Sequence, residues 1–146
     1  MLLAVRVFAD PELPRKAKDG ELELLQPCIG CLQGCVPNMF RGEAITCLVN
    51  PLAGRELEFE EQPAKEAKKI LVVGAGIAGL AAARILAKRG HHVLVAEKEQ
   101  KAGGQLNLAC RAPFKQEISK WIVYLKAECD RYGVEIRYET LADQAM

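Results

Sequence analysis

Residues 70–79 read ILVVGAGIAG, so an apolar run leads directly into the pattern G-x-G-x-x-G. A short continuous apolar run is typical of a parallel strand that is buried on both faces. The alanine-rich residues 77–89, followed by Gly90, predict a helix that begins within the glycine pattern. This order of strand, glycine-rich turn and helix predicts the start of a dinucleotide-binding fold.

The sequence after Gly90 continues the alternation of strands and helices. Residues 92–96 predict a second buried strand, and residues 134–138 predict a third. Between them, apolar residues recur at steps of three and four and predict an amphipathic helix that Gly133 ends. The residues of its apolar face are Phe114, Ile118, Trp121, Ile122, Leu125, Cys129 and Tyr132.

The predicted fold class is α/β. An irregular cysteine-rich segment is followed by the first half, βαβαβ, of a Rossmann-like parallel sheet that binds FAD. Half of such a sheet is a poor independent domain, so we expect further sequence after Met146.

Each glycine of the pattern has a separate role in this prediction. Gly74 permits the tight turn, and Gly76 lets the backbone approach a pyrophosphate at the positive end of the helix. Gly79 lets the helix pack closely against the strand. The alternative is a glycine turn in a parallel sheet that binds no ligand.

Glu97 stands at the end of the second predicted strand. Its carboxylate is expected to accept hydrogen bonds from ribose hydroxyls and to repel a 2′-phosphate, which favours FAD or NAD over NADP. A glycine pair such as Gly103-Gly104 commonly borders the FAD site of two-dinucleotide flavoproteins at this spacing, and this resemblance favours a flavin over a merely flexible turn. The predicted contacts of FAD or ADP are Gly74, Gly76, Ala78, Gly79, Glu97, Lys98, Gly103, Gly104, Gln105 and Leu106.

Four cysteines are spaced C-x2-C-x3-C-x11-C, at Cys28, Cys31, Cys35 and Cys47. Residues 28–55 show neither helical nor strand periodicity, and they predict an irregular loop with at most one helical turn near residues 37–41. Four thiolates suit a 4Fe-4S cluster, which would give this loop the core that it lacks. The alternatives are zinc, which usually takes two C-x2-C pairs, and reduced thiols without a ligand. We expect Cys129 to be a core residue and assign no role to Cys110.

The composition limits the classes of partner. Among the 146 residues, 20 Lys and Arg nearly balance 19 Asp and Glu, so neither nucleic acid nor a membrane surface is expected as a partner. The apolar residues at the start lack the basic leader of a signal peptide and the length of a membrane span. Six cysteines in a chain of this kind favour metal or redox chemistry, and we expect a cytoplasmic location.

Several motifs together resemble those of one family. They are Pro27-Cys28-Ile29-Gly30-Cys31, Gly34-Cys35, Cys47-Leu48-Val49-Asn50-Pro51, the glycine pattern at Gly74, Gly90-His91, and Gly103-Gly104-Gln105-Leu106. The combination resembles the 2,4-dienoyl-CoA reductase and trimethylamine dehydrogenase branch of the old yellow enzyme family. The resemblance covers the chain from about Ala9 to its end.

This resemblance implies a division of the chain and a set of partners. Residues 1–27 would be the tail of an FMN-binding TIM barrel, 28–55 the cluster segment, 56–69 a charged linker, and 70–146 the first part of the FAD or ADP domain. The chain then looks like an interior fragment whose parent protein binds FMN, NAD(P)H and a small-molecule substrate outside these residues. We expect no catalytic residue within the fragment.

The resemblance also implies a function. NAD(P)H would reduce FAD in the parent, and electrons would pass through the cluster to FMN, which would reduce an activated C=C bond. The alternatives are an amine dehydrogenase with ADP in the FAD site and electrons flowing outward, a non-catalytic module that senses redox state or nucleotide, and a zinc-stapled interaction module.

Overall fold

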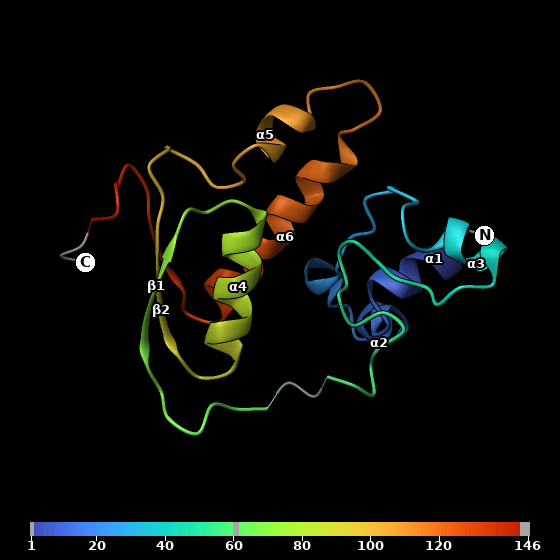
Figure 1. Cartoon of the computed structure of the whole chain (residues 1–146), viewed down its shortest axis with the longest axis horizontal. Helices are drawn as coiled ribbons and strands as arrows, with labels where there is room; N and C mark the ends of the chain where they lie inside the picture. The colour runs from blue at the N-terminus through green and yellow to red at the C-terminus, as the bar shows by residue number, and fades with distance from the viewer. Residues whose placement is uncertain (1, 60–61, 144–146) are drawn as a thin grey trace. The chain divides into compact units, whose positions relative to one another are not determined.

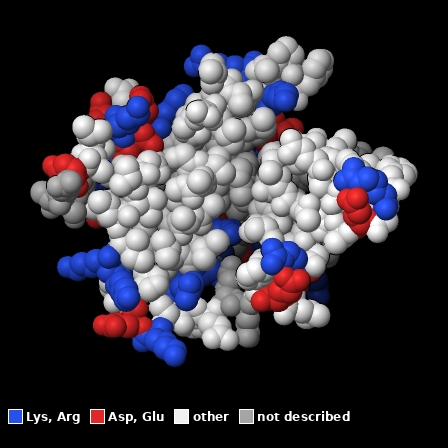
Figure 2. All heavy atoms as spheres, in the orientation of Figure 1, with Lys and Arg blue, Asp and Glu red and all other residues white. Residues whose placement is uncertain are grey.

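The computed structural model describes residues 2–59 and 62–143, and the chain forms two compact units that divide between Glu60 and Glu61 (Figure 1). Met1, Glu60, Glu61 and residues 144–146 lie outside the described residues, so the middle of the predicted linker and the end at Met146 are not described. None of the described helices is both long and apolar enough to cross a membrane. Figure 2 shows cationic and anionic side chains interspersed over the face in view.

The second unit is a parallel sheet with helical crossovers. Its elements are β1 (Lys69–Val73), α4 (Ile77–Lys88), β2 (His92–Ala96), α5 (Leu106–Ala109), α6 (Glu117–Arg131) and β3 (Glu135–Arg137). The strand order is β1-β2-β3, with Ile70 opposite Val93 and Val95 opposite Ile136. The predicted α/β class is confirmed, because both crossovers join parallel neighbours through a helix.

The core of this unit lies between the sheet and two helices. Helix α4 packs against α6 and β2, and Figure 1 shows both helices on one side of the sheet. Leu80 of α4, Val95 of β2 and Leu125 of α6 are fully buried at this junction. Apolar side chains at helical spacing therefore let α4 pack against β2 and α6 pack against α4, as their periodicity predicts.

Three sequence predictions in this unit need correction. Strand β1 is half-buried rather than buried on both faces, because the described helices cover only one side of the sheet. Phe114 is 97% exposed with φ 61°, so it lies in the loop before α6 instead of on the helix's apolar face. The third strand is shorter than residues 134–138, since only Glu135–Arg137 pair with β2.

The first unit contains short helices joined by irregular chain. These helices are α1 (Leu2–Ala9), α2 (Leu13–Lys18), the 3-10 helix η1 (Leu22–Leu24) and α3 (Val36–Arg41). Helix α3 corresponds to the single turn predicted near residues 37–41. Ala9, Val49 and Ala53 are buried, together with the polar residues Asp10, Lys16 and Asn50. Buried polar groups are costly unless they are hydrogen-bonded, so this interior depends on the bonds that Asp10, Lys16 and Asn50 make.

Cys129 is a core residue, as its place in the sequence predicts. Its burial is expected to make the folded state less stable at alkaline pH. Its side chain is fully buried and its thiol donates a hydrogen bond to the Leu80 carbonyl at 3.5 Å. Burial, and secondarily the charge of Asp130, raises the pKa of the Cys129 thiol from 9.0 to about 11. A group whose pKa is higher in the folded state holds its proton more tightly there, so its stabilisation is present below pH 9 and is lost as the pH rises through 11.

We therefore expect wild-type protein to lose on the order of 1–3 kcal/mol more stability than Cys129→Ala between about pH 8 and pH 11. Urea unfolding at a series of pH values, followed by circular dichroism, measures this difference. Parallel stability curves for the two proteins would show that the thiol does not titrate on unfolding.

Candidate functional site

The glycine turn between β1 and α4 has one position whose glycine the fold does not require. Gly74 has φ 93°, a conformation that side chains rarely adopt, and a Cβ on Gly79 would run into the carbonyl oxygen of Gly74. Gly76, by contrast, has φ −69° and no atom within 4 Å of the place that a Cβ would occupy. The missing side chain at Gly76 leaves the backbone at the start of α4 open to a ligand.

Glu97 ties this turn to the turn that follows β2. Glu97 is 6% exposed, and its carboxylate accepts hydrogen bonds on both oxygens. Oε2 accepts from the Ala75 N–H at 2.6 Å, and Oε1 accepts from the Glu99 N–H at 2.9 Å. A carboxylate has about four acceptor positions, so these bonds leave room for further donors. The sequence indicated a ribose ligand at Glu97 but not this structural bond.

The glycine pair after β2 lies against the glycine turn. The Gly103 N–H donates to the Ala75 carbonyl at 2.8 Å, and a Cβ on Gly104 would lie 3.3 Å from the Cα of Gly76. Both residues have positive φ, 113° and 51°. Asn107 holds this loop by donating from Nδ2 to the Ala102 carbonyl at 2.9 Å. The pair therefore forms a wall beside the open backbone at Gly76.

An open cleft of about 1150 Å³ lies at the carboxyl ends of the strands. Parallel strands end at the same edge of a sheet, and in folds of this kind ligands bind in the crevice outside that edge. Of the ten predicted contacts, Gly74, Glu97, Lys98, Gly104 and Gln105 line the cleft. Its other lining residues are Val73, Ala96, Glu99, Gln100, Lys101, Asn107, Glu139, Thr140, Leu141 and Ala142.

The remaining predicted contacts do not line the cleft. They are Gly76, Ala78, Gly79, Gly103 and Leu106. Sequence reasoning missed the segment after β3, where Glu139 accepts a hydrogen bond from Gln100 Nε2 at 3.1 Å. Its place in the sequence could have predicted this contact, because the segment follows a third parallel strand and therefore leaves the sheet at the same edge as the other two.

In the first unit, the four predicted cysteines line one small cavity. Cys28, Cys31, Cys35 and Cys47 lie around it with Phe8, Ile29, Leu32, Gly34, Thr46, Leu48 and Val49. The segment before Cys47 packs on the loop that carries the other three cysteines, because the Thr46 N–H donates to the Gly34 carbonyl at 3.0 Å. A Cβ on Gly34 would run into Thr46, so this approach requires a glycine.

The environment of Cys47 combines burial with backbone donors. Burial raises the pKa of the Cys47 thiol, the N–H groups of Val49 and Asn50 act in the opposite direction by bonding to it, and the charges of Cys28 and Cys31 raise it further. All six cysteines are free thiols. Within the described ranges, no group of three or more His, Cys, Asp or Glu side chains is arranged to hold a metal ion. The donor set around the cavity is four sulfurs, which is the set that a group bound by four thiolates requires.

Fold and cleft together define the second unit as a Rossmann-like domain, and residues 72–109 match the family model of the NAD(P)-binding Rossmann-like domain. The chain is 48% identical to a metal reductase from Desulforamulus reducens over 96% of its own length and 21% of that protein's. It is 45% identical to an NADH oxidase from Thermoanaerobacter brockii over 94% of its own length and 21% of that protein's. A solved 2-naphthoyl-CoA reductase in complex with 2-naphthoyl-CoA superposes with a TM-score of 0.91 at 37% identity, covering 94% of this chain and 21% of the other.

These relatives are oxidoreductases, and they confirm the resemblance that the motifs indicated. The chain is homologous to one segment of the 2,4-dienoyl-CoA reductase and trimethylamine dehydrogenase branch of the old yellow enzyme family. It spans about a fifth of the length of the relatives that it matches.

Gly76 and Gly79 are expected to respond differently to an added methyl group. Gly79→Ala places a Cβ against the Gly74 carbonyl and should cost about 1–3 kcal/mol of stability. Gly76→Ala meets open space and should change stability by less than about 1 kcal/mol. Thermal unfolding of both variants beside wild type measures the contrast. Equal losses would mean that the turn relaxes around Gly79.

Proposed function

We propose that the chain is the electron-transfer portion of an NAD(P)H-dependent flavin and iron-sulfur oxidoreductase. In this proposal it passes electrons between FAD and FMN through a 4Fe-4S cluster, toward reduction of an activated C=C bond. The observation that carries the proposal is that Cys28, Cys31, Cys35 and Cys47 line one cavity in a chain that also contains a Rossmann-like cleft. FMN, NAD(P)H and the substrate are assigned to other parts of a cytoplasmic parent protein.

The cleft and the glycine turn next to it together have the features that an adenine dinucleotide needs. Helix α4 is 12 residues long, and its N-terminus presents free N–H groups and a positive dipole beside the open backbone at Gly76. Glu97 lies at the wall of the cleft with acceptor capacity that its two backbone bonds do not use. We therefore assign the pyrophosphate of FAD or ADP to the turn at Gly76 and the adenosine ribose to Glu97.

The cavity has the donors that a cluster needs. Four thiolates would hold it, and the N–H groups of Val49 and Asn50 act to lower the pKa of one of them, Cys47, against the effect of its burial. Hydrogen bonds to cluster sulfurs tune the reduction potential. When bound, such a cluster carries one electron at a time, whereas flavins exchange either a hydride or single electrons. A one-electron carrier in the same chain as a flavin site fits transfer between two flavins better than direct hydride chemistry.

Removal of one cysteine tests the cluster. Protein purified without oxygen should contain about four irons and four sulfides per chain and absorb broadly in the violet-blue region. Cys31→Ser should abolish that absorption. Cys110→Ser is the matched control, because Cys110 lies outside the cavity lining and its loss should leave iron and absorption unchanged. Stoichiometric zinc in place of iron and sulfide would refute the cluster and support the zinc-stapled alternative.

Nucleotide binding tests the cleft separately. Calorimetric titration with ADP and with FAD should give binding to wild-type protein, and Gly76→Ala should weaken it by about tenfold, ~1.4 kcal/mol. The physical reason is that the added methyl group occupies the space left for the pyrophosphate. Ala87→Ser, near the other end of α4, is the control that should bind like wild type. Unchanged affinity in Gly76→Ala would place the nucleotide elsewhere.

A further inference from the structure

A glutamine just before the cysteine set reaches the chain just after it. Gln26 stands two positions before Cys28, and Val49 two positions after Cys47. The Gln26 side chain donates from Nε2 to the Val49 carbonyl oxygen at 2.6 Å. This bond joins the segment that enters the cysteine loop to the segment that leaves it.

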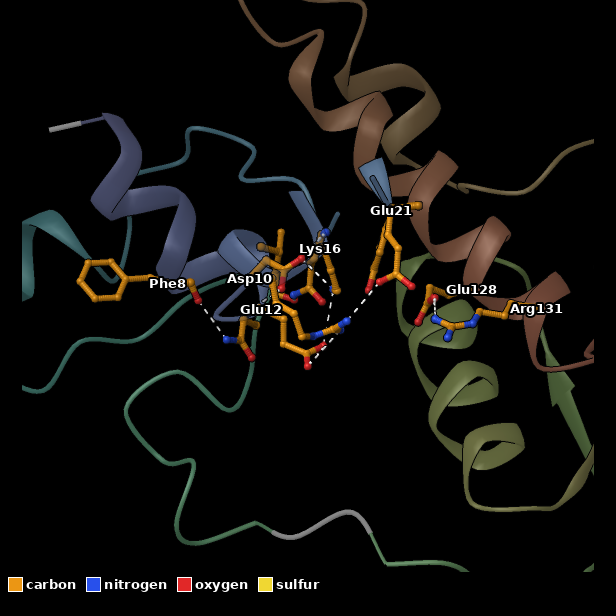
Figure 3. Close-up of polar contacts among 12 residues, drawn as sticks. Phe8, Asp10, Glu12, Lys16, Glu21, Glu128 and Arg131 are labelled. Atoms are coloured by element: carbon orange, nitrogen blue, oxygen red, sulfur yellow. Dashed lines mark hydrogen bonds and ion pairs between the residues drawn. The ribbon is translucent and has the colours of Figure 1, made fainter. Parts of the chain in front are cut away.

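Gln26 is itself held by a buried carboxylate. Asp10 is 3% exposed, and its Oδ2 accepts from the Gln26 backbone N–H and from Lys16 Nζ, each at 2.8 Å. Its Oδ1 accepts from the Glu12 N–H at 3.1 Å. Figure 3 shows the Asp10 carboxylate beside Lys16. The position of Gln26 is therefore fixed by a buried carboxylate that accepts three hydrogen bonds.

The far end of the bond is also fixed. Asn50 is buried, and its Nδ2 donates to the Phe8 carbonyl at 2.9 Å while its Oδ1 accepts from the Leu52 N–H at 3.1 Å. The Val49 carbonyl and the Asn50 N–H belong to one planar peptide, in which the two groups point in opposite directions. Gln26 bonds the carbonyl side of this plane, and the Asn50 N–H on the other side acts to lower the pKa of the Cys47 thiol.

We infer that Gln26 is a positioning residue of the cysteine site: it holds the 49–50 peptide so that its N–H points at the Cys47 sulfur. The inference rests on the proposed function in so far as the cysteines hold a cluster. A donor to the carbonyl of a peptide also polarises its N–H, which strengthens the bond to sulfur. Since N–H bonds to a ligand sulfur favour the more negative, reduced cluster, Gln26 should raise the reduction potential.

The test replaces the donor while keeping the shape. Gln26→Met has no N–H to give to the Val49 carbonyl but fills similar space. Gln33→Met is the matched control, since Gln33 is an exposed glutamine between two of the cysteines. The readouts are iron and sulfide content, the midpoint potential from a dye-mediated titration followed by visible and EPR spectra, and the melting temperature.

We expect Gln26→Met to retain its iron and to show a more negative midpoint potential. At a fixed potential its oxidised-to-reduced ratio should rise about three- to tenfold, the equivalent of losing one hydrogen bond. Gln33→Met should match wild type. If Gln26→Met fails to retain the cluster, Gln26→Asn, whose shorter side chain cannot reach Val49, must show the same negative shift.

The outcomes separate this inference from the function on which it rests. Iron and sulfide in wild type, with the same potential in wild type and in the Gln26 variant that retains the cluster, would overturn the role of Gln26 and leave the cluster intact. Wild-type protein without iron and sulfide would overturn both. A drop in melting temperature with no change in potential would make Gln26 a structural residue only.

Discussion

The Glu97 carboxylate is the interaction on which the second unit depends most. By accepting from the Ala75 N–H and the Glu99 N–H it joins the turns at the ends of two neighbouring strands, just beyond the last ladder bond from the Gly74 N–H to the Ala96 carbonyl. The parallel register brings these turns together, and the carboxylate fixes their separation. The glycine pair then closes on the same turn through the bond from Gly103 to Ala75. The side of the cleft lined by Gly74, Glu97 and Gly104 is fixed by this arrangement.

In the first unit, which has no sheet among the described residues, other contacts hold the functional loop in place. Its cysteine loop is held by side chain to backbone bonds from Gln26 and Asn50 and by the close approach of Gly34 to Thr46. Buried polar groups are costly unless they are bonded, and here the Asp10 carboxylate has three donors. The two sites are thus held by different interactions. Backbone pairing between strands positions the cleft, whereas a few polar side chains position the thiols.

How much the sequence predicts differs between these units for the same reason. The strand at residues 92–96 and the burial of Cys129 follow from local periodicity, and both are found as predicted. The spacing of the four cysteines likewise indicates a common site. Phe114 fits the helical period by chance, but the helix begins only at Glu117. The bonds made by Asp10 and Gln26 are beyond such reasoning, because they join residues up to 23 positions apart with no repeating pattern between them.

The link from Gln26 to Cys47 has a consequence for how related sequences can vary. Position 50 contributes its backbone N–H and the anchoring Asn50 side chain, whereas position 49 contributes only backbone groups, so exchanges of the Val49 side chain leave the link in place. Proline at position 50 is the exception, because it has no N–H to give. Across diverging relatives, the side chains at positions 26 and 50 would be the ones constrained by this contact, and covariation between the side chains at positions 26 and 49 would not reveal it.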